Sequence, residues 1–164
     1  MDQLGFLSGV FKENGKIIMN LIQGWNYFLS HEVVVGITME SNAARGPVSN
    51  AELLYLHDQG VPSRNIPPRP VLRPAINKPE TRKQIETLMR DAAVAALVTG
   101  NRDLCEKYFN KAGMVAQNAC KNYIKEGTNL APNSPVTIAI KGSSKPLIDT
   151  ASMMNSITYA VRKK

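Results

Sequence analysis

Two histidines and two cysteines are the side chains of this sequence with the greatest potential for chemistry. His31 and His57 are its only histidines, and Cys105 and Cys120 are its only cysteines. Nucleophilic catalysis would need a serine or cysteine tied to one of these histidines by a known motif, and the sequence has none. The four side chains also lack the paired spacing of a zinc site. We therefore expect no catalytic residue, no bound metal and no cofactor.

These four side chains are better explained as structural residues. Cys105 and Cys120 fall on one predicted helix, about 22 Å apart by the helical rise, which is too far for a disulfide within one copy. Both lie on or beside an apolar stripe, so we expect them in the core. His57 and the adjacent Asp58 do not face each other on a helix. We expect His57, and likewise His31, to be a partly exposed polar residue.

Phosphate-binding loops are not evident either. The segments ITMESNAARG (37–46) and IKGSSKP (140–146) lack the spacing and the strand-to-helix context that such a loop requires. The KGSSK stretch has groups that could touch a phosphate, but a solvated turn is the simpler interpretation. The terminal RKK (162–164) is typical of a solvated tail.

The formal net charge of +7 is distributed unevenly along the 164 residues. Residues 1–59 have three basic and six acidic side chains, whereas residues 60–79 have four basic side chains and no acidic one. Residues 127–164 have five basic side chains and one acidic side chain. This pattern suits either a polyanionic partner or copies of the chain stacked with opposite charges together. Net charge alone leaves both open.

Hydrophobic periodicity predicts the elements of the first 60 residues. In chain order we expect a helix over 16–29, a strand over 32–38, a loop over 39–50 and a second helix over 51–59. The last of these is ambiguous between helix and strand. Ser49 or Asn50 as a helix cap, and Glu52 in the first turn, favour the helix.

The segment 61–79 is the most distinctive part of the sequence, because six of the ten prolines fall in it. Proline removes the amide donor and fixes φ, so we predict neither a helix nor a central strand but an extended, polyproline-like arm. We call residues 61–79 the arm. Its apolar residues require burial, so the arm should lie on a surface, either of its own chain or of a neighbouring copy. These apolar residues are Ile66, Val71, Leu72 and Ile76.

The second half of the sequence predicts a helical hairpin followed by strands. Periodicity, with Gly100 and Asn101 as the turn and Gly127 as the stop, predicts two antiparallel helices over 80–126. Alternation then predicts C-terminal strands within 135–162, at 135–141 and 156–162, with one helical turn between them.

Together these elements indicate a single domain over 1–164 of the α+β class. A small antiparallel or mixed sheet would pack against the helical hairpin, and the extended Pro-rich arm would complete the fold. The apolar runs are far shorter than the ~20 residues of a transmembrane helix, so we expect none.

Two segments of the sequence, residues 50–76 and 132–162, resemble sequence motifs of a known protein family. The first contains IPPRPVLRP at 66–74, and the second contains KGSSKPLIDT at 141–150, followed by Ser156 and Ile157. In this order and separation they resemble the tailed-bacteriophage virion morphogenesis proteins, which act in the neck, in tail completion and in head–tail joining. The resemblance covers most of residues 32–162.

The sequence departs from that family's pattern at three places. Val71 and Ala151 stand where phenylalanine and glycine are usual in the family. Gln59 and Gly60 follow His57 and Asp58 where a Glu-Phe-Gly-like triplet would stand.

The resemblance implies a non-enzymatic structural subunit of the phage virion neck that forms a homo-oligomeric ring at the head–tail junction. It leaves open whether the ring is a connector, a collar or a tail terminator. The implied partners are further copies of the chain, the neighbouring neck proteins, the portal-side connector and the tail proteins. Genomic DNA would pass transiently through the channel, and no membrane is involved. The protein would be made in the host cytoplasm and incorporated into the virion.

A ring subunit needs a rigid element that reaches its neighbour, and a pre-extended arm loses little entropy on docking. We predict that the arm forms this inter-subunit interface, with Arg69 and Arg73 paired to carboxylates of the next copy or layer. The opposing interpretation, that the arm folds back on its own helices, stays open, and both can be partly true. The predicted interface residues are Ile66, Pro67, Pro68, Arg69, Pro70, Val71, Leu72, Arg73, Pro74 and Ile76.

Two other functions remain to be weighed. A basic nucleic-acid-binding module would explain the positive charge and would bind duplex DNA with a steep salt dependence. A hydrolase or transferase with an unrecognised site would show turnover that is lost when His31 or His57 is changed.

Overall fold

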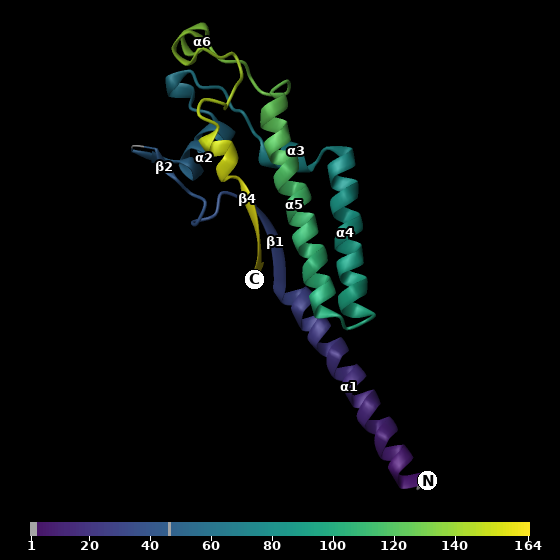
Figure 1. Cartoon of the computed structure of the whole chain (residues 1–164). Coiled ribbons are helices and arrows are strands. Elements are labelled where there is room, and N and C mark those ends of the chain that lie inside the picture. Colours follow the sequence, from purple (N-terminus) through teal and green to yellow (C-terminus); the bar gives the residue numbers. More distant parts are fainter. Residues whose placement is uncertain (1–2, 46) are drawn as a thin grey trace. The chain divides into compact units, whose positions relative to one another are not determined.

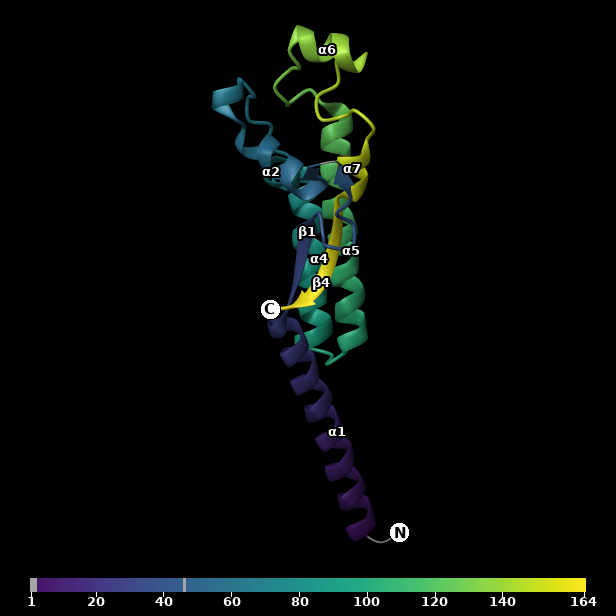
Figure 2. The same cartoon turned by 90° about the vertical axis from the view of Figure 1, so that its left-hand side faces the viewer.

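The computed structural model describes residues 3–45 and 47–164, and the side chains of residues 12–43 and 47–164. These residues are mostly helical, with seven α-helices and a small two-stranded antiparallel sheet (Figure 1). The helices are α1 (Gln3–Ser30), α2 (Asn50–Gln59), α3 (Leu72–Ile76), α4 (Pro79–Leu97), α5 (Arg102–Glu126), α6 (Pro135–Lys141) and α7 (Ser152–Ser156). The paired strands are β1 (His31–Gly36) and β4 (Thr158–Lys163), which lie side by side in Figure 2.

The chain divides into two compact units, each described here by itself. Unit 1 consists of Met1–Val33, Glu86–Ala112 and Val161–Lys164. Unit 2 consists of Val34–Ile85 and Gly113–Ala160. The expectation of a single domain over the whole chain stays a prediction.

Helix α1 is longer than the periodicity over 16–29 predicts, because it begins at Gln3. A glycine inside a helix costs about 1 kcal/mol relative to alanine but does not stop it, and the helix runs through Gly15. Its last residues join the core of unit 1, whereas its N-terminal half extends beyond the ends of α4 and α5 (Figures 1 and 2). The buried core residues of unit 1 are Tyr27, Ala92, Ala95, Ala96, Cys105 and Phe109.

Two glycines allow α1 to lie directly on the end of the hairpin. A Cβ at Gly24 would collide with the carbonyl oxygen of Ala96. A Cβ at Gly100 would stand 2.7 Å from the carbonyl carbon of Asn20, and the φ of +65° at Gly100 also favours glycine. The close approach of the two backbones therefore depends on the absence of side chains at both positions.

The predicted helical hairpin is confirmed, with α4 and α5 packed against each other. The second helix has the predicted bounds, Arg102–Glu126. Its cap is Asn101, whose Oδ1 accepts a hydrogen bond from the backbone N–H of Leu104 at 2.9 Å. Gly127 follows it with a φ of +67°, in the left-handed region that terminates helices.

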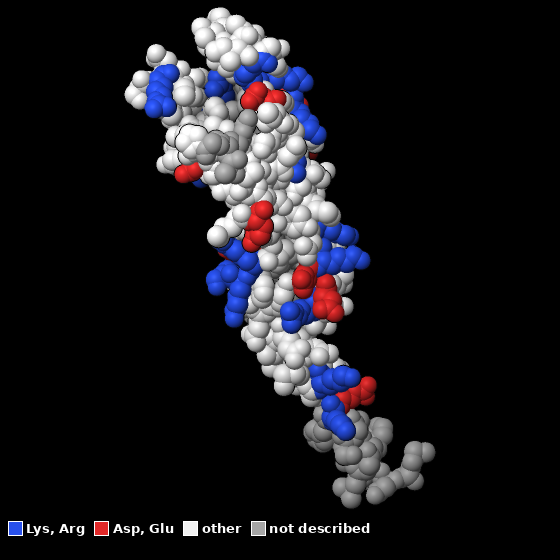
Figure 3. Space-filling view, turned by 60° about the vertical axis from the view of Figure 1, so that its left-hand side comes forward, with Lys and Arg blue, Asp and Glu red and all other residues white. Residues whose placement is uncertain are grey.

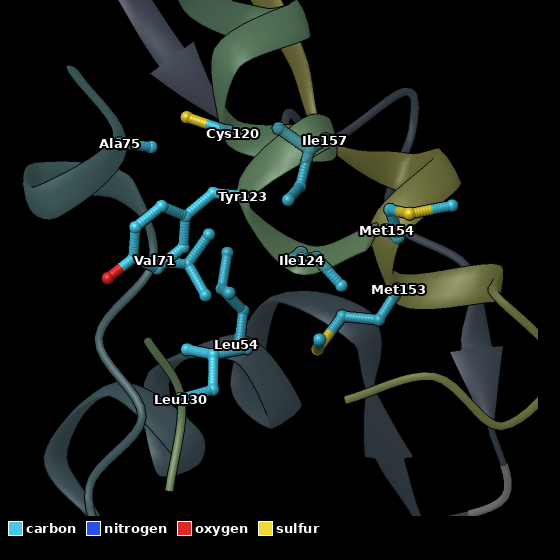
Figure 4. Close-up of a cluster of buried hydrophobic side chains, with 10 residues drawn as sticks. All are labelled: Leu54, Val71, Ala75, Cys120, Tyr123, Ile124, Leu130, Met153, Met154 and Ile157. Atoms are coloured by element: carbon cyan, nitrogen blue, oxygen red, sulfur yellow. The ribbon is translucent and has the colours of Figure 1, made fainter. Parts of the chain in front are cut away.

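The core of unit 2 brings together segments that lie far apart in the sequence (Figure 4). Leu54 comes from α2, Val71 from the arm, Ile124 from α5 and Met153 from α7. Helix α2 confirms the helical interpretation of 51–59, since Ser49 caps it and forms a reciprocal capping box with Glu52. The ten buried residues are Leu54, Val71, Ala75, Cys120, Tyr123, Ile124, Leu130, Met153, Met154 and Ile157.

The predicted strand over 135–141 is wrong, because this segment is helix α6. Ser134 caps the helix by accepting from the N–H of Thr137 at 3.1 Å, proline occupies its first position, and Gly142 ends it with a φ of +65°. These local signals outweigh the alternation of Val136, Ile138 and Ile140, which are all exposed rather than buried on one face.

The expected loop at 39–50 is also more structured than predicted. It contains two short antiparallel strands, β2 (Ala44–Arg45) and β3 (Val48–Ser49), which pair with each other. The predicted helical turn near 151–155 is confirmed as α7, and the predicted last strand is confirmed as β4.

The extended, polyproline-like conformation predicted for the arm is wrong in two places. Residues Pro62–Arg64 form a 3-10 turn, and Leu72–Ile76 form helix α3. Pro74 is the third residue of α3, and the first four amides of a helix have no partner within it, so proline costs no hydrogen bond there.

The α+β class holds only in its coarse form, a helical protein with a small antiparallel sheet. In unit 2, a Cβ at Gly113 of α5 would collide with the ring of Tyr159 of β4. No helix in the described ranges is long and apolar enough to cross a membrane.

Candidate functional site

The apolar residues of the arm are used inside the chain. Val71 and Ala75 are fully buried in the core of unit 2, and Leu72 and Ile76 pack against the same core. Ile66 pairs with Val61 through two backbone hydrogen bonds, of 2.8 and 3.1 Å, that close a tight loop. These residues match the interpretation in which the arm folds back on its own chain.

Arg69, one of the two arginines expected to pair with a neighbour, is 93% buried. Only 7% of its surface is exposed, and its guanidinium donates to two backbone carbonyls, from Nε to Ala131 at 2.7 Å and from Nη2 to Pro132 at 2.8 Å. Burial lowers the pKa of Arg69 below its ordinary value. Its fork therefore ties the arm to the segment before α6, which is a structural role within the chain.

The remaining predicted interface residues have a different environment. Pro67, Pro68, Pro70 and Arg73 are exposed, and Pro74 is half-buried. They lie on the outer side of the arm, where a neighbouring copy can reach them. The inter-subunit role predicted for the arm therefore stays a prediction that rests on these residues.

Unit 2 holds a cleft of about 690 Å³ between α2, the arm and α6. Its charged lining is mostly cationic, with Arg64, Arg69 and Lys141 against Asp149. Asn133, Ser134 and Thr137 add amide and hydroxyl groups. The charged side chains of the lining therefore sum to a positive charge, although the guanidinium of Arg69 is already used by two backbone carbonyls.

His57 lies in the wall of this cleft and, like His31, is partly exposed, as predicted. Its Nδ1 is buried and has no hydrogen-bond partner among the described residues. Burial lowers the pKa of His57, and the positive charges of Arg69 and Lys141 lower it further. Both effects favour the neutral imidazole over the charged one.

The other chemically active side chains do not line this cleft. His31 stacks on Tyr27 with ring centroids 4.0 Å apart, and its Nδ1 lies 2.9 Å from the Tyr27 carbonyl oxygen. Cys105 and Cys120 are fully buried, as predicted, and burial raises the pKa of each thiol to about 11. Within the part of the chain that the structure describes, no three His, Cys, Asp or Glu side chains gather to hold a metal ion.

Sequence reasoning missed a surface on α1, because it treated the apolar residues of this helix as one stripe. The structure separates them into two. The stripe that faces the hairpin consists of Leu21, Gly24, Tyr27 and Phe28, which are buried or half-buried. The second stripe, which we call the α1 stripe, consists of Ile18, Ile22, Trp25 and Leu29, and each of its side chains is about half exposed.

The spacing of these four residues along the sequence already indicates that they share one side of the helix. They recur at intervals of four, three and four, and so fall within about 60° of one another around the helix axis. Residues 17–30 contain no charged side chain. In Figure 3, a surface with few charged side chains, drawn in white, lies just above the lowest group of blue and red side chains. A helix with two apolar stripes needs a neighbour on each, and only one of these is covered in the described chain.

Comparison with known proteins found no match for this chain. No family model matches the sequence, no curated protein matches it, and no solved structure matches the fold.

Proposed function

We propose that this protein is a structural subunit of the neck of a tailed-bacteriophage virion, without enzymatic activity. It forms a homo-oligomeric ring at the head–tail junction, as a connector, collar or tail-terminator layer. Its partners are further copies of itself, the adjoining neck proteins, the portal-side connector and the tail proteins. Genomic DNA passes near the ring in the channel. The protein is made in the host cytoplasm and ends in the virion.

One observation carries this proposal: the two segments that resemble the phage family share a single core. Residues 50–76 supply Leu54 and Val71, and residues 132–162 supply Met153 and Ile157 to the same buried cluster. The side chain of Arg69 joins the two segments through its bond to the carbonyl of Pro132. The resembling residues therefore form one physical unit rather than two unrelated matches.

The finer form of the fold belongs to the same proposal, namely a sheet that packs on the helical hairpin. It is supported in unit 2 by Tyr159 of β4 against Gly113 of α5. In unit 1, Val33 of β1 and Val161 of β4 pack against the core formed by α1, α4 and α5.

Assembly is supported by the apolar surface that the single chain leaves open. Isolated exposed apolar side chains are ordinary, but contiguous ones mark interaction sites. The α1 stripe is contiguous, and the exposed prolines of the arm add a second rigid surface with little entropy to lose. A chain with apolar surface left open fits a protein whose working form is an assembly.

The decisive experiment is a phage whose copy of this gene carries an early stop codon. We expect filled heads and separate tails in the electron microscope, and joined particles when the gene is supplied in trans. A cryo-electron-microscopy map of wild-type particles should place the chain in a ring at the neck. Joined, infectious particles from the mutant would contradict the proposed function.

The contribution of the arm is tested by Arg73→Glu, which reverses an exposed charge outside the core. Lys107→Glu, which reverses the charge at an exposed position of α5, is the matched control. If the arm is an interface, only the first substitution should reduce the yield of joined particles. Equal yields would remove the arm from the interface.

A gel-shift assay with duplex DNA at ~50 mM salt tests the alternative function. Tight binding that weakens steeply as salt is added would favour a basic nucleic-acid-binding module. A neck subunit is expected to show no tight complex, since DNA must pass through the channel.

A further inference from the structure

The α1 stripe is an apolar surface of unit 1 that the described residues of the chain leave open. Exposed fractions of 57% for Ile18, 49% for Ile22, 49% for Trp25 and 56% for Leu29 leave half of each side chain open to solvent. The stripe lies about a third of a turn away from the stripe that packs on the hairpin. Its position on a continuous helix means that one partner surface could cover all four side chains at once.

The same unit carries a second exposed apolar surface on α4. Val94 and Val98 are 48% and 69% exposed, whereas Ala92, Ala95 and Ala96 on the opposite side of the helix are buried. Val94 lies in the last turn of α4, and Val98 directly follows this helix and donates its N–H to the carbonyl oxygen of Val94 at 3.0 Å, so the two side chains lie one above the other. One copy therefore offers two different apolar surfaces.

Two different complementary surfaces are what a ring requires. A contact between unlike surfaces of identical copies repeats around an axis until it closes, whereas a contact of one surface with itself stops at a dimer. We propose that the α1 stripe of one copy packs on unit 1 of a second copy of this chain, across its Val94 and Val98. The inference deepens the proposed function, on which it rests for the ring.

The area available agrees with a specific contact. A half-open side chain of this size leaves roughly 100 Å² exposed, since a large one buries about 150–250 Å² in full. Four stripe residues and two valines then contribute about 600 Å² of apolar surface, and apolar atoms make up about 57% of an interface. The whole contact would be about 1,000 Å², which is the lower limit for a specific interface.

The charge pattern favours a protein over a lipid surface as the occupant. Helices that lie on membranes carry lysine and arginine on their polar face. Residues 17–30 contain neither, and the polar side of this part of α1 presents amide side chains such as Asn20, Gln23 and Asn26. The α1 side of the contact therefore carries no charge that would have to be stripped of water when the stripe is covered.

The first test is sedimentation of the full chain with Ile22→Asp. A buried carboxylate in the contact should raise the dissociation constant of self-association at least about tenfold. Ile140→Asp, the same change at an exposed position of α6 in unit 2, is the matched control and should associate like the wild type. Trp25 is the only tryptophan, so its emission should move to shorter wavelength as the wild-type protein associates.

The second test identifies the receiving surface and does not depend on how well Ile22→Asp folds. Ile22→Cys and Val94→Cys are purified separately, mixed and oxidised. The native Cys105 and Cys120 are fully buried and should not interfere. A disulfide between the two variants, formed in the mixture and in neither variant alone, is the expected result.

Several results would overturn the inference. These are a wild-type chain that stays monomeric up to ~100 µM, equal effects of the two aspartates, or a disulfide formed by Ile22→Cys alone. A monomer that sediments with phosphatidylcholine vesicles would also overturn it, in favour of a membrane surface. The two proposals can fail separately. If virions contain the chain but Ile22→Asp associates as the wild type does, only this inference is contradicted. If virions do not contain the chain, only the proposed function is contradicted.

Discussion

The guanidinium of Arg69 donates from Nε to the carbonyl oxygen of Ala131 at 2.7 Å, across 62 positions of sequence. A second bond from Nη2 reaches the carbonyl of Pro132 at 2.8 Å. The arm is thus fastened to the segment that leads into α6, and the same residues line the cationic cleft. This contact holds the proline-rich arm in place beside the core of unit 2, in which Val71 of the arm is buried.

Arg69→Lys should therefore destabilise the protein although it keeps the charge. A lysine ammonium lacks the planar fork that reaches two carbonyls together. The substitution disrupts two hydrogen bonds from a charged group, so we expect the free energy of unfolding to fall by about 2–4 kcal/mol. Urea denaturation measures it. Arg73→Lys, at an exposed position, should change the value by less than about 0.5 kcal/mol, and equal effects would mean that the fork is unimportant.

Two glycines of α1 should respond in opposite directions to alanine. A Cβ at Gly24 would collide with the Ala96 carbonyl, so Gly24→Ala should lower the free energy of unfolding by about 2 kcal/mol or more. No described atom lies within 4 Å of a Cβ at Gly15. There Gly15→Ala should raise helix stability by up to about 1 kcal/mol. Thermal denaturation of the pair is the measurement, and a destabilised Gly15→Ala would show that α1 is covered at that point.

Alkaline pH should weaken the fold through the two buried thiols. Burial raises the pKa of Cys105 and of Cys120 from 9.0 to about 11. Between these values the folded state holds a proton that the unfolded state has released, so stability falls as pH rises above 9. The loss approaches about 2–3 kcal/mol per thiol near pH 11.

Denaturation at pH 8, 9 and 10 measures this slope. The double variant Cys105→Ala with Cys120→Ala should show a flatter profile than the wild type. Burial also raises the pKa of Tyr27, to about 12, which acts in the same direction above pH 10. A slope that survives in the double variant below pH 10 would contradict the assignment to the thiols.

Mild acid should weaken the fold through His57. Its pKa lies below the ordinary value of 6.5 in the folded state, because burial and the charges of Arg69 and Lys141 disfavour protonation. The unfolded state binds a proton as pH falls through 6.5 before the folded state does, so stability is lost in that direction. His57→Gln should remove part of the loss between pH 7 and pH 5. An unchanged acid slope in this variant would place its origin elsewhere.

The elements that sequence reasoning predicted well are those with local signals. Helix α5 begins after the cap Asn101 and ends before Gly127, and both residues act within one turn of the helix. Helix α2 follows the same logic through its capping box of Ser49 and Glu52. Such signals are written in neighbouring residues, and they can be read without a partner from elsewhere in the chain.

The error at 135–141 shows the limit of periodicity. Val136, Ile138 and Ile140 alternate as in a half-buried strand, yet none of them is buried and no strand pairs with them. Alternation predicts a strand only where a neighbouring strand and a core cover one face, and the capping residues of α6 favoured a helix instead.

The sequence by itself determined the helical hairpin, the buried positions of both cysteines and the apolar character of α1, and it narrowed the cap of α2 to Ser49 or Asn50. It did so because caps, turns and periodic apolar residues act over a few positions. Only the tertiary structure decided that Arg69 reaches Ala131, that Val71 is buried in the chain's own core, and that one stripe of α1 is covered while the other is exposed. Each of these depends on which distant segment supplies the opposing surface, and burial is a property of both surfaces together.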